Sequence, residues 1–251
     1  MSPLREQLRQ RASLVGCFQQ IPAAESTEAA AFAGLDFSIF DLEHALIDDA
    51  QIAALLRAAE ASGIAPLARL PHADGPRIGR LLDAGLAGIF VAHVRSAAAA
   101  REIVEATRYP PRGHRSAAGT RATGYGRTAS LPELIDSEGG DPAVVAMIED
   151  GTGVENASEI AAVDGVDALF LGTTDLSVDL GAPGQRDHPD VVAAVSAVCE
   201  AAAAHGISAG VPVASGADGR IALERGATFV ATGDVHTLIG GLEQFRATSL
   251  E

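Results

Sequence analysis

Two carboxylates and one imidazole lie close together in the segment FDLEHALID, residues 40–48. Asp41, Glu43 and His44 directly follow the apolar run 37–40. Acids beside an imidazole can bind a cation or transfer a proton. The alternative is a strand that simply runs out into a polar loop, and only the other candidate residues of the chain can decide between the two.

Further polar residues stand at or just after three other apolar runs. Arg69 lies in PLARL, Glu149 ends AVVAMIE, and Asp175 follows ALFLG within GTTDLS. If these runs are parallel strands, their carboxyl ends meet at one shared mouth, where α/β barrels carry their chemistry. Each residue also has a structural explanation when taken alone, such as a buried ion pair of Arg69 with Asp83 or a loop role for His44.

Taken together, these residue types favour a metal site beside an anion-binding arginine. Glu149 and Asp175 suit a hard divalent ion such as Mg²⁺ or Mn²⁺, with water and substrate as the remaining ligands. Arg69 can bind a carboxylate through two hydrogen bonds. A 2-oxo acid offers both a carboxylate and a ketone that a metal ion can polarise. Cys17 and Cys199 fall outside these strand ends, so we expect buried, reduced thiols and no zinc site.

Composition excludes several classes of function. All 18 basic residues are Arg, so a lysine Schiff base to a ketone or to pyridoxal phosphate is impossible. The formal net charge of −15 disfavours nucleic acid as a partner. No apolar run approaches the roughly 20 residues of a membrane span, and the amino terminus lacks the apolar stretch of a signal peptide. We therefore expect a soluble, cytoplasmic protein with no membrane partner.

The arrangement of apolar runs predicts a single (β/α)8 TIM barrel over residues 1–251. Helical patterns separate the runs, so the strands must pair in parallel, and eight strands close a barrel. An open doubly wound sheet is the alternative, but a Gly-rich phosphate turn is missing after the first run. The predicted strands are 15–19, 37–42, 66–70, 88–94, 143–149, 168–172, 208–213 and 228–232.

One long irregular segment, residues 110–130, interrupts this pattern. It contains Arg112, Arg115, Arg121 and Arg127, together with four glycines. Loops of this length in compact domains are usually lids, binding segments or subunit contacts. Its arginines can favour an acidic or polyhydroxylated substrate, or equally form salt bridges between subunits.

An ordered set of motifs resembles the HpcH/HpaI family of class II, metal-dependent pyruvate aldolases, the type of 4-hydroxy-2-oxoheptanedioate aldolase. The resemblance covers nearly the whole chain. The motifs are DLEHA (41–45), ARLPHADGPRIGRLLDAG (68–85), ATRYPPRGHRS (106–116), AMIED (146–150), LGTTDLSVDLG (171–181) and HPDV (188–191).

The resemblance implies a reaction and a cofactor. A 4-hydroxy-2-oxo acid is reversibly cleaved to pyruvate and an aldehyde through an enolate stabilised by a divalent ion, Mg²⁺, Mn²⁺ or Co²⁺. Glu149 and Asp175 would ligate this ion. Arg69 would bind the pyruvyl carboxylate and help to hold the enolate.

The resemblance also implies roles for the neighbouring residues. His44, paired with Asp41, would handle the proton of the aldol hydroxyl. Asp83 would orient the site from behind, and the backbone at Thr173 and Thr174 would contact the pyruvyl carboxylate. The last helix would pack on a neighbouring subunit in a homo-oligomer, a hexamer built as a trimer of dimers.

The sequence departs from the family pattern at three places. Met147 replaces a frequent Gln, Thr173 a frequent Pro, and Ala92, followed by His93, another frequent Pro. These changes leave the aldehyde partner open, and Glu43 is without an assigned role. The alternatives are a lyase or synthase of CoA thioesters on the same barrel, a non-catalytic barrel subunit, and a purely structural network of buried ions.

Overall fold

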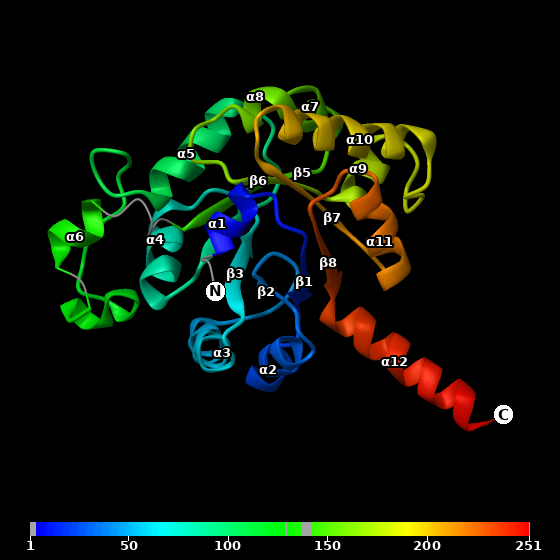
Figure 1. The fold of residues 1–251 in the computed structure, drawn as a ribbon, viewed down its shortest axis with the longest axis horizontal. Helices are drawn as coiled ribbons and strands as arrows, with labels where there is room; N and C mark the ends of the chain where they lie inside the picture. Colours follow the sequence, from blue (N-terminus) through cyan, green and yellow to red (C-terminus); the bar gives the residue numbers. More distant parts are fainter. Residues whose placement is uncertain (1–3, 129, 137–141, 251) are drawn as a thin grey trace.

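A computed structural model describes residues 4–128, 130–136 and 142–250, so both ends of the predicted domain 1–251 lie outside the described residues. Eight parallel strands form one closed barrel in chain order, and β8 pairs with β1 (Figure 1). The predicted TIM barrel is confirmed. The strands are β1 (Leu14–Gln19), β2 (Phe37–Asp41), β3 (Ala65–Leu70), β4 (Gly88–Val91), β5 (Ala143–Ile148), β6 (Ala168–Leu171), β7 (Ser208–Pro212) and β8 (Phe229–Gly233).

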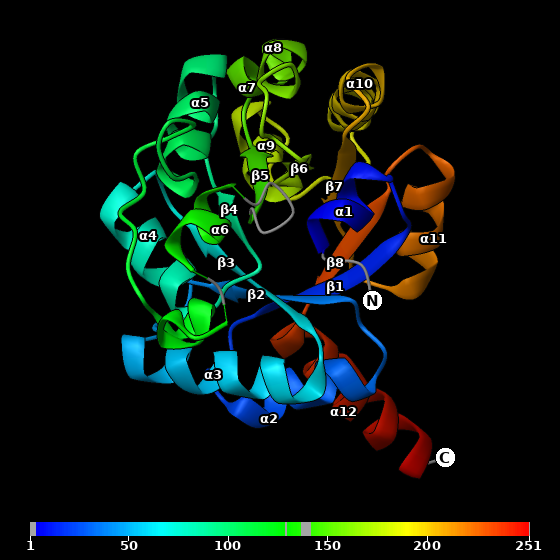
Figure 2. The same cartoon turned by 60° about the vertical axis from the view of Figure 1, so that its left-hand side comes forward.

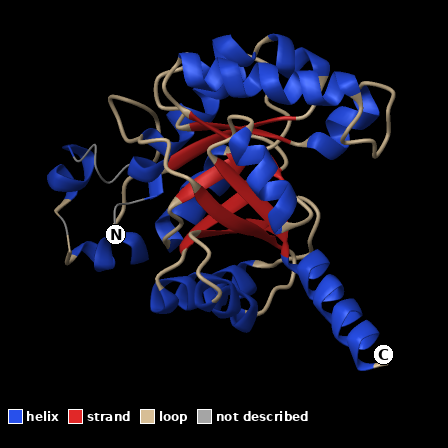
Figure 3. Cartoon of the chain, turned by 45° about the vertical axis from the view of Figure 1, so that its right-hand side comes forward, coloured by secondary structure: helices blue, strands red, loops and turns tan. Residues whose placement is uncertain are grey.

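Helices follow the strands and surround the barrel (Figures 2 and 3). The α-helices are α1 (Leu4–Arg9), α2 (Ala24–Phe32), α3 (Asp49–Ser62), α4 (Gly75–Ala84), α5 (Ala97–Thr107), α6 (Leu131–Asp136), α7 (Gly151–Glu155), α8 (Ala157–Ala161), α9 (Thr173–Asp179), α10 (Pro189–Ala204), α11 (Gly216–Glu224) and α12 (Asp234–Ser249). A 3₁₀ helix, η1 (Arg121–Gly126), lies in the long segment after α5.

The barrel interior is filled by aromatic rings that meet edge to face. The ring centroids of Phe90 and Phe170 lie 5.2 Å apart, at an interplanar angle of 67°. Such packing requires glycine on the facing strands, because a Cβ atom on Gly210 would lie 2.4 Å from the ring of Phe229. The interior is therefore a packed core, and space for a ligand has to come from the loops at its ends.

Local signals set the helix boundaries as expected. The side chain of Asp48 accepts from the backbone N–H of Gln51 at the start of α3, and the Gln51 side chain binds back to Asp48. Gly63 and Gly85 follow α3 and α4 in left-handed conformations, with φ of 79° and 115°. A residue with a Cβ atom would be strained at either position.

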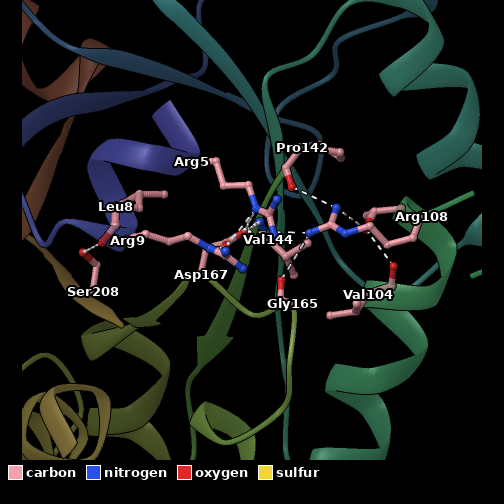
Figure 4. Close-up of polar contacts among 11 residues, drawn as sticks. Arg5, Leu8, Arg9, Val104, Arg108, Pro142, Val144, Gly165, Asp167 and Ser208 are labelled. Atoms are coloured by element: carbon pink, nitrogen blue, oxygen red, sulfur yellow. Dashed lines mark hydrogen bonds and ion pairs between the residues drawn. The ribbon is translucent and has the colours of Figure 1, made fainter. Parts of the chain in front are cut away.

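The amino-terminal end of the barrel is closed by α1 and a fully buried acid. Leu4 and Leu8 of α1 pack into the interior core. Asp167 is 0 % exposed and accepts from Nε of Arg5 at 3.1 Å, from Nε of Arg9 at 2.9 Å and from the backbone N–H of Val144 at 3.0 Å (Figure 4). The carboxylate thus ties α1 to the starts of β5 and β6.

Both cysteines are buried and free, as the sequence predicts. Burial is the main cause that raises the pKa of Cys17 and of Cys199 to about 11. Neither thiol is a reactive nucleophile in this fold.

Within the described part of the chain, no helix combines the length and the apolar character that crossing a membrane requires.

The buried acid at the base of the barrel gives a stability prediction. We expect Asp167→Asn to lower the free energy of unfolding by about 3 kcal/mol, because two guanidinium groups lose a desolvated counter-ion. Urea unfolding at a fixed protein concentration measures the loss. Asp164→Asn, an exposed carboxylate three residues earlier in the chain, is the matched control and should change stability by less than about 0.5 kcal/mol. Equal effects of the two variants would contradict the role of Asp167.

Candidate active site

Parallel register brings Asp41 and Arg69 side by side at the carboxyl end of the barrel. The two residues are direct partners in the pairing of β2 with β3. Nε of Arg69 donates to Oδ1 of Asp41 at 2.9 Å, and Nη2 donates to Oδ2 at 2.6 Å. The guanidinium also lies over the ring of Phe18, 4.7 Å from its centroid. The arginine is thus held on two sides in one orientation.

The Asp41 carboxylate is fully occupied by donors. Besides Arg69, it accepts from Nε2 of Gln20 at 3.0 Å and from the backbone N–H groups of Glu43 and His44 at 3.2 and 3.1 Å. Burial alone would raise the pKa of Asp41, but the hydrogen bonds and charge of Arg69, with help from Gln20 and the His44 N–H, hold that pKa below its ordinary value. Asp41 is therefore an ionised anchor for Arg69.

Glu149 and Asp175 converge just beyond β5 and β6. Glu149 is 3 % exposed, and a Cβ atom on Gly172 would lie 2.5 Å from its Cγ, so glycine permits the close approach. Burial first, then a hydrogen bond with Asp175 that only the protonated acid can make, and the negative charge of Glu43 and Asp175 raise the pKa of Glu149 to about 8. The backbone N–H of His93 opposes this shift.

This acidic pair fits a divalent cation. Oε2 of Glu149 is buried without a hydrogen-bond partner in the described structure. A positively charged ligand beside this oxygen would satisfy it. Among the residues that the structure describes, no group of three or more His, Cys, Asp or Glu side chains is arranged to hold a metal ion. Two carboxylates that leave the other positions to water and substrate are typical of Mg²⁺ sites.

His93 is a mouth residue for which the sequence suggested no role. The predicted strand 88–94 is too long: β4 ends at Val91, and His93 adopts a φ of 57°. Its Nε2 lies 3.2 Å from Oε1 of Glu43, and its Nδ1 lies 3.9 Å from Oε2 of Glu149. Its position just after the fourth strand is the sequence signal that could have identified it, because the other candidate residues lie at equivalent strand ends.

His44 meets Asp41 through its backbone N–H. Its ring is half-exposed, and Nε2 lies 3.9 Å from Oε2 of Glu43. The carboxylate that lies close to the His44 ring is therefore that of Glu43, whereas the resemblance implied a pairing of His44 with Asp41.

Asp83 lies on α4 and points to the long loop. Its Oδ1 accepts from Nη2 of Arg115 at 2.7 Å, and the Arg115 guanidinium also stacks on Tyr109. Arg121 donates to the backbone oxygen of Ala84 at 3.0 Å. These arginines hold the loop against α4 within one chain, which accounts for them without a substrate.

Thr173 and Thr174 begin α9, beside the acidic pair. Oγ1 of Thr173 is buried and has no hydrogen-bond partner in the described structure, whereas Oγ1 of Thr174 lies 3.3 Å from Nη2 of Arg186. Met147, one of the departures from the family pattern, is 4 % exposed and belongs to the interior core.

The geometry of the mouth agrees with the comparison to known proteins. Residues 14–240 match the family described as HpcH/HpaI aldolase/citrate lyase. The chain belongs to this family. The predicted resemblance is thereby confirmed, and so is its coarse consequence that the chain is a member of a family of aldolases and lyases.

Individual HpcH/HpaI relatives differ in the reaction that their names state. The chain is 36 % identical over 220 residues to 5-keto-4-deoxy-D-glucarate aldolase of Enterobacter sp. (strain 638), covering 87 % of this chain and 85 % of that protein. A crystal structure of a family member from Burkholderia cenocepacia J2315 has a TM-score of 0.93 at 30 % identity and covers 100 % of both chains. The citrate synthase SbnG has a TM-score of 0.87 at 32 % identity, covering 98 % of this chain and 97 % of its own.

The Asp41–Arg69 pair predicts a pH-dependent contribution to stability. Because the pKa of Asp41 is lowered in the folded protein, the contribution is complete above the ordinary pKa of 3.8 and is lost as the pH falls through the folded value. We expect Asp41→Asn to cost about 2 kcal/mol at pH 7 and distinctly less at pH 3. Urea unfolding of both proteins at the two pH values tests this. A cost that stays constant with pH would contradict the assignment.

Proposed function

We propose that this protein is a divalent-metal-dependent aldolase that reversibly cleaves a 4-hydroxy-2-oxo acid to pyruvate and an aldehyde. The observation that carries the proposal is the convergence of the buried carboxylate of Glu149 with the exposed carboxylate of Asp175 at the barrel end that also holds Arg69. Membership of the HpcH/HpaI family and the aldolase names of curated relatives support it.

Glu149 and Asp175 would hold the metal ion. When bound, a divalent ion supplies Lewis-acid polarisation of a carbonyl oxygen. The position of the acidic pair would also determine where the reacting end of the substrate lies, because the ketone and carboxylate oxygens of a 2-oxo acid are attracted to a cation held there and not to the carboxylates themselves. Thr173 and Thr174 are placed beside Asp175 and would contact that carboxylate.

Arg69 would stabilise the negative charge that develops on the substrate. Its anchoring by Asp41 and Phe18 fixes the guanidinium before the substrate arrives, so little reorganisation is needed during the reaction. Cleavage of the C3–C4 bond moves an electron pair toward the C2 oxygen. A cation aimed at that oxygen lowers the barrier because the charge is larger in the transition state than in the substrate.

His44 would take the proton from the C4 hydroxyl as the bond breaks. Its ring is half-exposed at the mouth and can reach a bound substrate. The C4 oxygen then forms the aldehyde carbonyl, and the three-carbon enolate accepts a proton at C3 to give pyruvate. Decarboxylation of oxaloacetate gives the same enolate, so we expect it as a side activity.

Two of the four arginines in the long loop are not available to a lyase of CoA thioesters. Such an enzyme needs basic residues that are available for the phosphates of CoA. Arg115 and Arg121 instead bind Asp83 and the carbonyl oxygen of Ala84. We therefore retain the aldolase as the proposed function.

A pyruvate-release screen tests the proposal. A panel of 4-hydroxy-2-oxo acids should release pyruvate with added Mg²⁺, Mn²⁺ or Co²⁺, and a chelator should abolish the release. Glu149→Gln and Asp175→Asn should each lower kcat by about 100-fold or more. Asp150→Asn is the matched control, because the Asp150 carboxylate is engaged by Arg95 and caps α7. Turnover that survives the chelator, or that is unaffected by the two substitutions, would contradict the proposal.

We further propose that α12 packs on a second copy of the chain. No residue of α12 is buried, and the helix points away from the barrel (Figures 1 and 3). Leu238, Leu242 and Phe245 form an exposed apolar stripe along it. A groove of about 690 Å³ lies beside the first turns of α12, and the exposed side chain of Val15 in β1 lines part of it. An exposed apolar stripe of this kind is usually buried against another protein surface. A neighbouring subunit in the hexamer implied by the family resemblance would supply that surface.

A double substitution, Leu242→Glu with Phe245→Glu, tests the packing of α12. The charges should disrupt the contact and shift the protein to a smaller assembly, as measured by light scattering after size exclusion. Ala247→Glu is the control, since Ala247 lies on the opposite side of the helix. An unchanged mass for the double variant would contradict the proposal.

A further inference from the structure

Glu43 is a buried carboxylate with one unsatisfied oxygen at the centre of the mouth. Its side chain is 8 % exposed, and Oε2 has no hydrogen-bond partner in the described structure. Oε1 lies 3.2 Å from Nε2 of His93. Oε2 lies 3.4 Å from Nε of Arg69 and 3.9 Å from Nε2 of His44. A buried acceptor without a donor is costly, so this geometry calls for an explanation.

Asp41, the other acid of the DLEH motif, is not free to serve the His44 ring. Both of its oxygens accept hydrogen bonds from Arg69, and Oδ2 also accepts from Gln20. Its contact with His44 is made by the backbone N–H. The imidazole therefore faces Glu43 as its available carboxylate.

His93 is held in place by an unusual backbone conformation. A φ of 57° is sparsely populated for a residue with a side chain and persists only where the surroundings enforce it. The turn aims Nε2 of the ring at Glu43, while the backbone N–H lies 3.4 Å from Oε1 of Glu149. One residue thus links the carboxylate beside His44 to the acidic pair.

We propose that Glu43 and His93 are positioning residues for the proton step of the aldol cleavage and that they act through His44. His93 lies beside one oxygen of Glu43, and the other oxygen lies between Nε of Arg69 at 3.4 Å and Nε2 of the His44 ring at 3.9 Å. A small rotation of the half-exposed His44 side chain closes the 3.9 Å gap to a hydrogen bond. Glu43 then accepts from one ring nitrogen and orients the other toward the C4 hydroxyl. This inference rests on the aldolase function proposed above.

Two reactions that form the same enolate can distinguish a positioning role for Glu43 and His93 from general damage to the active site. In aldol cleavage, the proton passes from the C4 oxygen to His44, the C3–C4 bond breaks, and its electron pair becomes the C2–C3 double bond of the enolate. In oxaloacetate decarboxylation, the bond to the leaving CO₂ supplies that electron pair, and no hydroxyl proton is removed. Only the first reaction needs an oriented imidazole.

Glu43→Gln and His93→Gln should therefore change the ratio of the two activities. We expect kcat for aldol cleavage to fall by about 10- to 100-fold, as for other residues that orient a reacting group. The kcat of oxaloacetate decarboxylation should change by less than about threefold in both variants, and Mn²⁺ should still bind. His72→Gln, an exposed imidazole just after β3, is the matched control and should leave both activities unchanged.

A double-variant cycle with His44 completes the test. If Glu43 acts through His44, Glu43→Gln should have little further effect on aldol cleavage in a His44→Ala background. Equal losses in both reactions, loss of Mn²⁺ binding, or independent effects in the cycle would overturn the inference. If one single variant does not fold, the other decides the outcome. A parent protein that catalyses neither reaction would instead overturn the proposed function.

Discussion

Crowding of negative charge at one end of the barrel is the constraint on which the site depends. The negative charges of Glu43 and Asp175 raise the cost of ionising Glu149, in a chain whose net charge is already −15. Burial and these neighbours raise the pKa of Glu149 to about 8, far above that of an exposed glutamate. A fold tolerates such an arrangement if a cation relieves it. Arg69, held in place by Asp41, is the second positive group at the mouth beside such a cation.

The buried acids at the two ends of the barrel differ in whether their oxygens have partners. At the base, Asp167 is neutralised by Arg5 and Arg9 and joins α1 to the strands (Figure 4). At the mouth, Oε2 of Glu149 is left without a hydrogen-bond partner in the described structure. The first acid stabilises the fold, whereas the second is available to a ligand. This division is usual for TIM barrels, whose stability and chemistry lie at opposite faces.

Much of this could be predicted from the sequence, because strand ends and parallel register follow from apolar runs and connection lengths. The runs before Asp41 and Arg69 place both residues at one level of the barrel. The choice of partners could not be predicted, because Asp41 and Glu43 are chemically alike and only three-dimensional geometry shows which one binds Arg69. The left-handed turn at His93 was equally hidden, since sequence patterns favour glycine there.

The most direct measurement is calorimetric titration of the metal-free protein with Mn²⁺ at pH 7 in two buffers of different ionisation enthalpy. Glu149, with its pKa near 8, is mostly protonated at that pH, and a cation must displace its proton. We expect one Mn²⁺ per chain, bound with release of about one proton. Absence of Mn²⁺ binding would contradict a metal site at Glu149 and Asp175, and binding without proton release would contradict the raised pKa of Glu149.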